Sequence, residues 1–112
     1  RERVAKVFSF SDVTVVTSLQ EVFGLTTTES LASGVPVVGF SVGGVAEQVT
    51  DDCGILVDKK DTRGLADAIS EMLDHDKKRK SFSKNARERV LQQYSIPKFR
   101  DRYLDLYKNL VE

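Results

Sequence analysis

The sequence has little of the chemistry that builds disulfides and metal sites. Cys53 is its only cysteine and His75 its only histidine. No disulfide can therefore form within the chain, and no cysteine or histidine cluster is available to a metal. We expect neither a metal nor a cofactor. A lone cysteine also fits a reducing compartment, which favours a cytoplasmic protein.

Long apolar runs and an excess of one charge are missing as well. No stretch approaches the roughly 18 apolar residues of a membrane-spanning helix. Lys plus Arg and Asp plus Glu number 17 each, so nothing in the charge balance favours nucleic acid as a partner. With 112 residues, of which 40% are hydrophobic, the chain is predicted to form no more than one globular domain.

Short apolar runs alternate with helical patterns along the first part of the chain. Strands are predicted at 13–17, 36–40 and 55–57. Helices are predicted at 1–9, 25–33 and 45–49, then from Asp61 or Thr62, from Asp76 and from Ile96. The helix after Asp61 has a predicted core stripe of Leu65, Ala66, Ile69, Met72 and Leu73.

This alternation predicts an α/β fold with parallel strands, covered by helices on both faces. The expected architecture is a partial Rossmann-like parallel sheet of about three strands. A doubly wound sheet normally has about five or six. The chain also begins with Arg1, inside a predicted helix. We therefore expect it to be part of a longer protein.

The candidate chemistry lies between the first strand and the next helix. The segment reads Glu21-Val22-Phe23-Gly24-Leu25-Thr26-Thr27-Thr28-Glu29. It follows the carboxyl end of a strand, where open parallel sheets bind ligands. The first helical turn leaves free amides that can hold a phosphate, and Gly24 lets a ligand approach the backbone closely. At about 100° per residue, Thr26, Glu29 and Ser33 share an outward face, so Glu29 can accept hydrogen bonds from a sugar.

Both glutamates also have structural interpretations. Thr26-x-x-Glu29 matches a capping box, in which Glu29 would bond to the backbone of its own helix. Glu21 can bind a second sugar or can be a solvated loop acid. The local pattern leaves these alternatives open.

A wider set of motifs resembles glycosyltransferase family 4, the group 1 glycosyltransferases. The motifs are Glu21-x-Phe23-Gly24 with Glu29 eight positions after the first Glu, Ala32-Ser33-Gly34-Val35-Pro36-Val37-Val38, Gly43-Gly44-x-x-Glu47, and Gly54-Ile55-Leu56-Val57. The resemblance is close over residues 1–75, and only helical character is shared over 76–112.

The resemblance implies a GT-B fold, in which two Rossmann-like domains face a cleft. This chain would be one partial domain, the C-terminal segment of the donor-binding domain. Residues 1–75 would be its nucleotide-sugar-binding part and 76–112 its C-terminal helices. A neighbouring N-terminal domain of the same protein would bind the acceptor.

The resemblance also implies roles for the matched residues. Glu21 would be the catalytic residue facing the donor sugar, and Glu29 would bind the ribose. The backbone would hold the sugar or the diphosphate at Phe23, Gly24, Leu25 and Thr26. Gly43 and Gly44 would form a neighbouring loop packed near the phosphates. Glu47 would either cap a helix or line the site.

The implied reaction transfers a sugar from a nucleoside-diphosphate sugar to a hydroxyl with retention of configuration, in polysaccharide or glycoconjugate biosynthesis. The Arg and Lys that this family supplies to the diphosphate match no residue here, so we expect the isolated 112 residues to be inactive. The alternatives are another GT-B enzyme, such as a nucleotide-sugar epimerase, and a non-catalytic nucleotide- or protein-binding module.

Surface features bear on other partners. An open strand edge and the wide apolar face of the last helix predict self-association of this piece. The run Lys77–Lys80 is flanked by acids and is typical of a solvated helix face, with peripheral contact to the cytoplasmic membrane face as the alternative. Cys53 lies in a turn without a base beside it, so we expect it to be passive.

Overall fold

The computed structural model describes residues 2–111, so Arg1 and Glu112, the ends of the predicted domain, lie outside it. The described elements are α1 (Glu2–Ser9), β1 (Thr14–Val16), α2 (Leu25–Ala32), β2 (Val37–Phe40), α3 (Gly43–Gln48), β3 (Gly54–Val57), α4 (Thr62–Asp74), α5 (Asp76–Gln93) and α6 (Ile96–Val111). The predicted α/β class is confirmed, with strand ends shifted by one residue.

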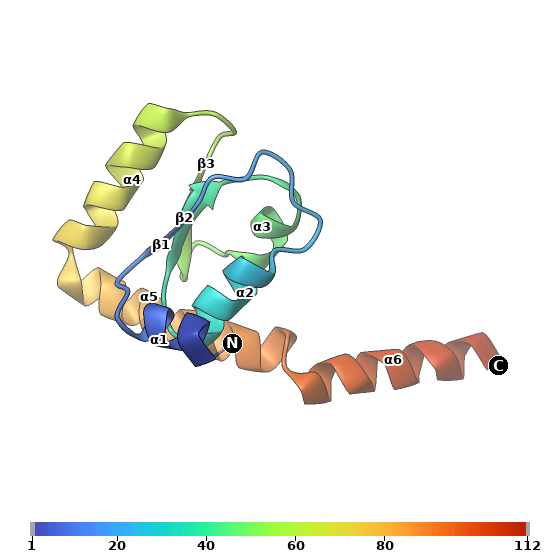
Figure 1. Cartoon of the computed structure of the whole chain (residues 1–112). Helices are drawn as coiled ribbons and strands as arrows, with labels where there is room; N and C mark the ends of the chain where they lie inside the picture. The colour runs from blue at the N-terminus through green and yellow to red at the C-terminus, as the bar shows by residue number, and fades with distance from the viewer. Residues whose placement is uncertain (1, 112) are drawn as a thin grey trace.

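The three strands form one parallel sheet in the order β1-β2-β3. Val15 lies opposite Val38, and Val38 lies opposite Ile55. All four residues of the central strand β2 are buried, which explains its continuous apolar sequence. Figure 1 shows α4 on one side of the sheet and α2 and α3 on the other. The partial Rossmann-like sheet with helices on both faces is confirmed.

The core gathers side chains from both faces of the sheet. Its completely buried members include Leu31 of α2, Val37 and Val38 of β2, Val45 of α3 and Met72 of α4. Cys53 is also completely buried beside them.

The predicted stripe on α4 is wrong at Ala66 and Leu73, which are both exposed. Ala68 is buried instead, because the buried face follows the spacing of Leu65, Ala68 and Met72.

The ends of α2 and α4 follow the predicted signals. Gly34 adopts a φ of 74°, and its amide donates to Leu31 O at 3.0 Å. The amide of Val35 donates to Ser30 O at 2.9 Å, which completes the C-terminal stop of α2. At the start of α4, the carboxylate of Asp61 accepts a hydrogen bond from the amide of Gly64 at 2.9 Å.

Two of the four basic residues at the start of α5 pair with neighbouring acids. Lys78 bonds to Glu71 and lowers the pKa of that carboxyl, mainly through this hydrogen bond. Arg79 contacts Asp76 at 2.7 Å. These pairs favour the interpretation of this run as a solvated helix face.

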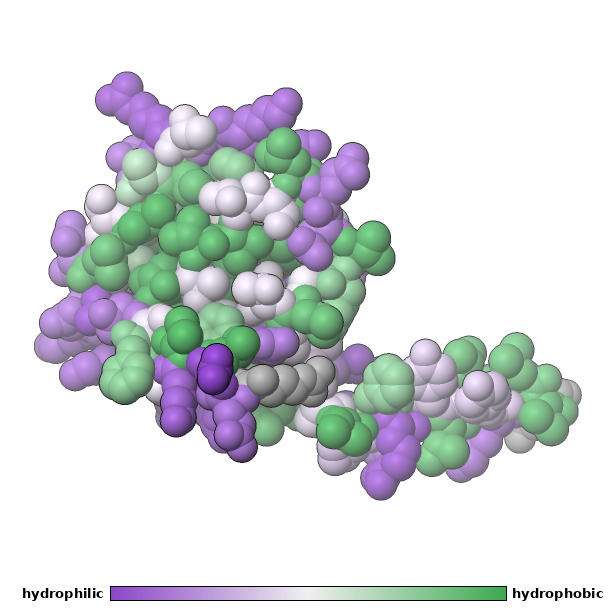
Figure 2. All heavy atoms as spheres, in the orientation of Figure 1, coloured by the Kyte–Doolittle hydropathy of each residue, from purple (hydrophilic) through white to green (hydrophobic). Residues whose placement is uncertain are grey.

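The last helix stands away from the rest of the described chain (Figure 1). None of its residues is buried. Figure 2 shows many apolar side chains along it, and more than half of the surface of Phe99, Tyr107 and Leu110 is exposed. No helix of residues 2–111 combines the length and the apolar character needed to cross a bilayer.

We predict that Met72→Ala lowers the free energy of unfolding by about 2–5 kcal/mol, because it leaves a cavity in the core. The adjacent Leu73→Ala removes a side chain that is 46% exposed and should cost less. Urea denaturation of both variants measures the difference. Equal losses would contradict the assignment of Met72 to the core.

Candidate functional site

The chain between β1 and α2 borders a cavity at the carboxyl end of the sheet. The cavity has a volume of about 450 Å³. It is lined by the end of β1, by Glu21 and Phe23, and by the first turn of α2. The expected position of the candidate segment, beyond the end of a parallel strand, is confirmed.

The amino end of α2 presents free backbone donors to this cavity. Gly24 is the N-cap and supplies no side-chain cap. The first amide that bonds within the helix is that of Thr28, which donates to Gly24 O at 3.0 Å. Among residues 2–111 no hydrogen bond engages the amides of Leu25, Thr26 or Thr27. These amides and the helix dipole make the cavity suited to an anion.

The capping-box interpretation of Glu29 is wrong. It requires Thr26 to be the N-cap, whereas α2 begins at Leu25 with Gly24 as its N-cap. Glu29 therefore lies one turn inside the helix. No hydrogen bond or ion pair holds its carboxylate within the described residues, so that group is available to a ligand.

The outward face predicted for α2 is confirmed. Thr26 and Ser33 are exposed and Glu29 is half-buried, whereas Thr27 and Leu31 are buried. The sequence pattern therefore predicted correctly which side of α2 faces outward.

The expectation that Gly43 and Gly44 form a loop is wrong, because both lie in the first turn of α3. This turn packs directly against the segment that carries Glu21. A Cβ atom on Gly44 would lie 2.3 Å from Val22 O, and one on Gly43 would overlap Glu21 O. The amide of Gly44 also donates to Glu21 O at 2.7 Å. The two glycines therefore set the position of the Glu21 backbone.

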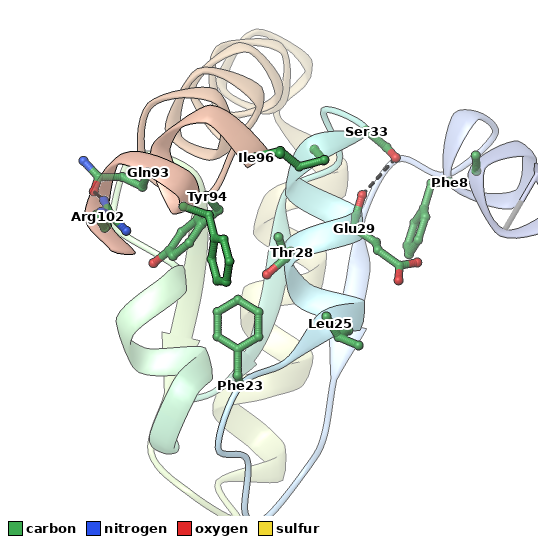
Figure 3. A pocket seen from close by; sticks show the side chains of 13 residues that line it. Phe8, Phe23, Leu25, Thr28, Glu29, Ser33, Gln93, Tyr94, Ile96 and Arg102 are labelled. Atoms are coloured by element: carbon green, nitrogen blue, oxygen red, sulfur yellow. Dashed lines mark hydrogen bonds between the residues drawn. The ribbon is translucent and has the colours of Figure 1, made fainter. Parts of the chain in front are cut away.

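The two glutamates line different cavities. Glu21 borders the cavity at the start of α2, whereas Glu29 borders a larger cleft of about 780 Å³. This cleft lies between α1, α2 and the junction of α5 with α6 (Figure 3). Phe23 and Leu25 line both cavities and so lie between them.

The cleft is mostly apolar and rich in aromatic rings. Figure 3 shows Phe23 pointing toward Tyr94, and their ring centroids are 6.0 Å apart at an interplanar angle of 64°. Glu29 points to the opposite side, beside Phe8 of α1. Ile96 and Phe99 of α6 also line the cleft.

Sequence reasoning missed the residues that support the segment from behind. These residues lie far from the segment in the sequence: Gln48, Arg89 and Tyr94. Only Gln48 could have been noticed in the sequence, because it is a polar residue in a short apolar helix. It is completely buried. Glu47 is exposed and lines neither cavity, and it does not cap α3, whose N-cap is Val42.

No group of His, Cys, Asp and Glu side chains within residues 2–111 is arranged to hold a metal ion. His75 lies exposed between α4 and α5. Its Nδ1 is 2.8 Å from Glu71 O.

Comparisons with known proteins agree on one family. Residues 1–89 match the family model described as "Glycosyl transferases group 1". Over 112 residues the chain is 32% identical to N-acetyl-alpha-D-glucosaminyl L-malate synthase of Bacillus anthracis, covering 99% of this chain and 29% of that protein.

Solved structures share the fold. Sucrose-phosphate synthase from Thermosynechococcus elongatus matches with a TM-score of 0.89 and 34% identity, over 98% of this chain and 28% of that one. A mutant of TarM from S. aureus matches with a TM-score of 0.83 and 26% identity, over 96% of this chain and 22% of that one. It was solved in complex with fondaparinux, alpha-GlcNAc-glycerol and UDP. The chain spans less than a third of each protein compared.

We predict that Gly44→Ala displaces the 21–23 segment, because the new Cβ would meet the Val22 carbonyl. Chymotrypsin should then cleave after Phe23 faster than in the unmodified protein, as measured by the mass of the released fragment. Gly34→Ala is the matched control. It strains a left-handed backbone at the other end of α2, at a cost of about 1–2 kcal/mol. Faster cleavage in both variants alike would indicate general destabilisation instead.

Proposed function

This chain belongs to the group 1 glycosyl transferases, and on that premise we propose that it forms one wall of a nucleotide-sugar donor site. The whole protein would be a retaining glycosyltransferase of family 4. It would transfer a sugar from a nucleoside-diphosphate sugar to a hydroxyl acceptor.

The observation that carries this proposal is the set of open amides at the start of α2. Leu25, Thr26 and Thr27 line the same cavity, and none of their amides has a partner among residues 2–111. A diphosphate supplies the negative charge and the acceptor oxygens that such a helix end stabilises. The UDP bound by TarM, whose fold this chain shares, supports a nucleoside diphosphate as the ligand.

Glu29 lines the neighbouring cleft, across Phe23 and Leu25 from the open amides, and we assign to it a ribose that reaches past these two side chains from the diphosphate. A helix rises about 1.5 Å per residue, so Glu29 is only a few ångströms further along the axis than the open amides. Its unpaired carboxylate can accept two hydrogen bonds, one from each hydroxyl of a ribose. A nucleoside diphosphate presents its phosphates and its ribose at neighbouring positions in this way.

Glu21 is suited to contact the donor sugar. Its backbone is fixed by the Gly44 amide, and its side chain lines the cavity that the open amides border. In the proposed reaction the bond between the anomeric carbon and the phosphate oxygen breaks, and the electron pair leaves with the diphosphate. The acceptor hydroxyl oxygen bonds to the same carbon, and its proton passes to the leaving diphosphate.

Charge that builds on the diphosphate is stabilised by donors already in place. No Lys or Arg appears among the described residues that line the Glu21 cavity. Neutralisation by cations would therefore come from other parts of the longer protein, which is consistent with our expectation that the isolated chain is inactive.

We predict that Glu29→Gln weakens nucleoside diphosphate binding by about 1–3 kcal/mol, because it removes a charged hydrogen-bond acceptor. The melting temperature should change little, since Glu29 caps no helix. Calorimetric titration of the full-length protein, with the nucleoside diphosphate that stabilises it most in a thermal-shift panel, measures the effect.

The matched control is Glu47→Gln, an exposed glutamate on the neighbouring helix that lines neither cavity. Its affinity should equal that of the unmodified protein. Unchanged affinity in Glu29→Gln would remove the ribose role, and a full-length protein stabilised by no nucleoside diphosphate would remove the donor site itself.

A further inference from the structure

Arg89 of α5 binds the carboxyl end of α3. Its Nε donates to Gln48 O at 2.8 Å, and its Nη2 donates to Glu47 O at 2.7 Å. The last carbonyls of a helix have no partner within that helix, so this one guanidinium supplies two missing donors. Arg89 thereby fixes the backbone of Gln48, whose side chain extends toward α2.

Gln48 connects this anchor to the start of α2. Its Nε2 donates to Thr28 Oγ1 at 3.0 Å, and Thr28 Oγ1 donates to Gly24 O at 3.2 Å. Gly24 is the N-cap whose carbonyl also accepts the first helical hydrogen bond. Hydrogen bonds therefore connect Arg89 to the residue that begins the open helix end, joined through the covalent bonds between the backbone and the side chain of Gln48.

A second contact path leads from the same guanidinium to Phe23. The guanidinium carbon of Arg89 is 5.9 Å from the centroid of the Tyr94 ring. The Tyr94 ring in turn meets Phe23 edge to face, at a centroid distance of 6.0 Å. Phe23 is 47% exposed, so the Tyr94 ring is one of the contacts that hold a partly covered side chain in place.

The helix start receives incomplete support from its other neighbours. Thr27 Oγ1 and Gln48 Oε1 are buried without a hydrogen-bond partner in the described chain, which is energetically unfavourable. Both oxygen atoms lie in close contact with the position that a Cβ atom on Gly24 would occupy. The conformation of the first turn of α2 therefore depends on the hydrogen bonds and ring contacts described above.

We propose that Arg89 is a positioning residue for residues 21–24 and the start of α2, which we call the donor loop, and that it acts on Gly24 through Gln48 and Thr28 and on Phe23 through Tyr94. This inference rests on the proposed donor site, because it assigns Arg89 to the preorganisation of that site. When Arg89 is lost, the loop occupies more conformations, and the fraction able to bind falls. Apparent affinity falls by the same factor.

Lysine cannot fully replace this arginine. The planar fork of a guanidinium reaches two carbonyls and stacks on a ring at once, whereas an ammonium acts as a point charge. Arg89→Lys should therefore retain only part of the effect, and Arg89→Met should lose it.

The chain offers a matched control in Arg87, also on α5. Its Nη1 donates to Ala32 O at 3.0 Å, at the opposite end of α2. Arg87→Met thus removes the same kind of bond, from an α5 arginine to a carbonyl in the last turn of a helix, without touching the loop.

The test compares Arg89→Met, Arg89→Lys and Arg87→Met in the full-length protein. Amide hydrogen exchange of peptides covering residues 18–28 is measured without ligand, and the dissociation constant for the best-binding nucleoside diphosphate is measured by calorimetry. We expect faster exchange in this segment and an about three- to tenfold weaker affinity for Arg89→Met, within the range known for residues that act through a network. Arg89→Lys should be intermediate, and Arg87→Met should match the unmodified protein in both measurements.

Exchange at 18–28 that is equal in Arg89→Met and Arg87→Met would overturn the positioning role. If Arg89→Met does not fold, the same comparison is made with Arg89→Lys, and unmodified exchange in that variant would overturn it. If the unmodified protein binds no nucleoside diphosphate while Arg89→Met still loosens the segment, the donor-site proposal fails and the support of the loop by Arg89 stands.

Discussion

The candidate site depends on one contact between two backbones. The segment carrying Glu21 lies against the first turn of α3, and this is feasible only because Gly43 and Gly44 have no side chains. A single hydrogen bond, from the Gly44 amide to Glu21 O, fixes the distance between them. This contact directs the segment back over the end of the sheet to Gly24, where α2 begins. Moving the segment outward would shift Glu21, Phe23 and the open helix end together.

The site is built from backbone groups on one side and supporting side chains on the other. The amides of the first turn of α2 face the cavity, whereas Gln48, Tyr94 and Arg89 hold that turn from behind. Amides carry no net charge and need no rotamer to be chosen, so their geometry is set by the fold alone. A site of this kind tolerates changes in its exposed side chains and is sensitive to changes in the residues that fix its backbone.

Features with a local cause could be predicted from the sequence. The three strands, the outward face of α2 and its end at Gly34 follow from apolar periodicity and from one left-handed residue. The start of a helix is less certain: the capping box at Glu29 needs Thr26 as the N-cap, and an N-cap two residues earlier, at Gly24, was enough to exclude it. Likewise, two glycines in sequence indicated a turn, while tertiary contact with the Glu21 segment places them inside α3.

Features with a distant cause could not be predicted. Glu21 and Glu29 lie eight positions apart, but their separation into two cavities depends on Phe23 and Leu25 lying between them. The bond from Arg89 to Gln48 joins residues 41 positions apart. No periodicity or motif within α5 indicates that contact, because it depends on how two helices cross.

The isolation of α6 has a thermodynamic consequence. None of its 16 residues is buried, although Ile96 and Phe99 line the cleft. A helix of this length is only slightly longer than the roughly 12–15 residues below which isolated helices are marginally stable in water. Unwinding α6 therefore costs the sheet and its covering helices little support beyond the contacts of Ile96 and Phe99 at the cleft. We therefore expect α6 to unfold separately from the rest of residues 2–111. A spectroscopic probe on α6 and one in the core should then report different unfolding midpoints, which a single two-state curve would not fit.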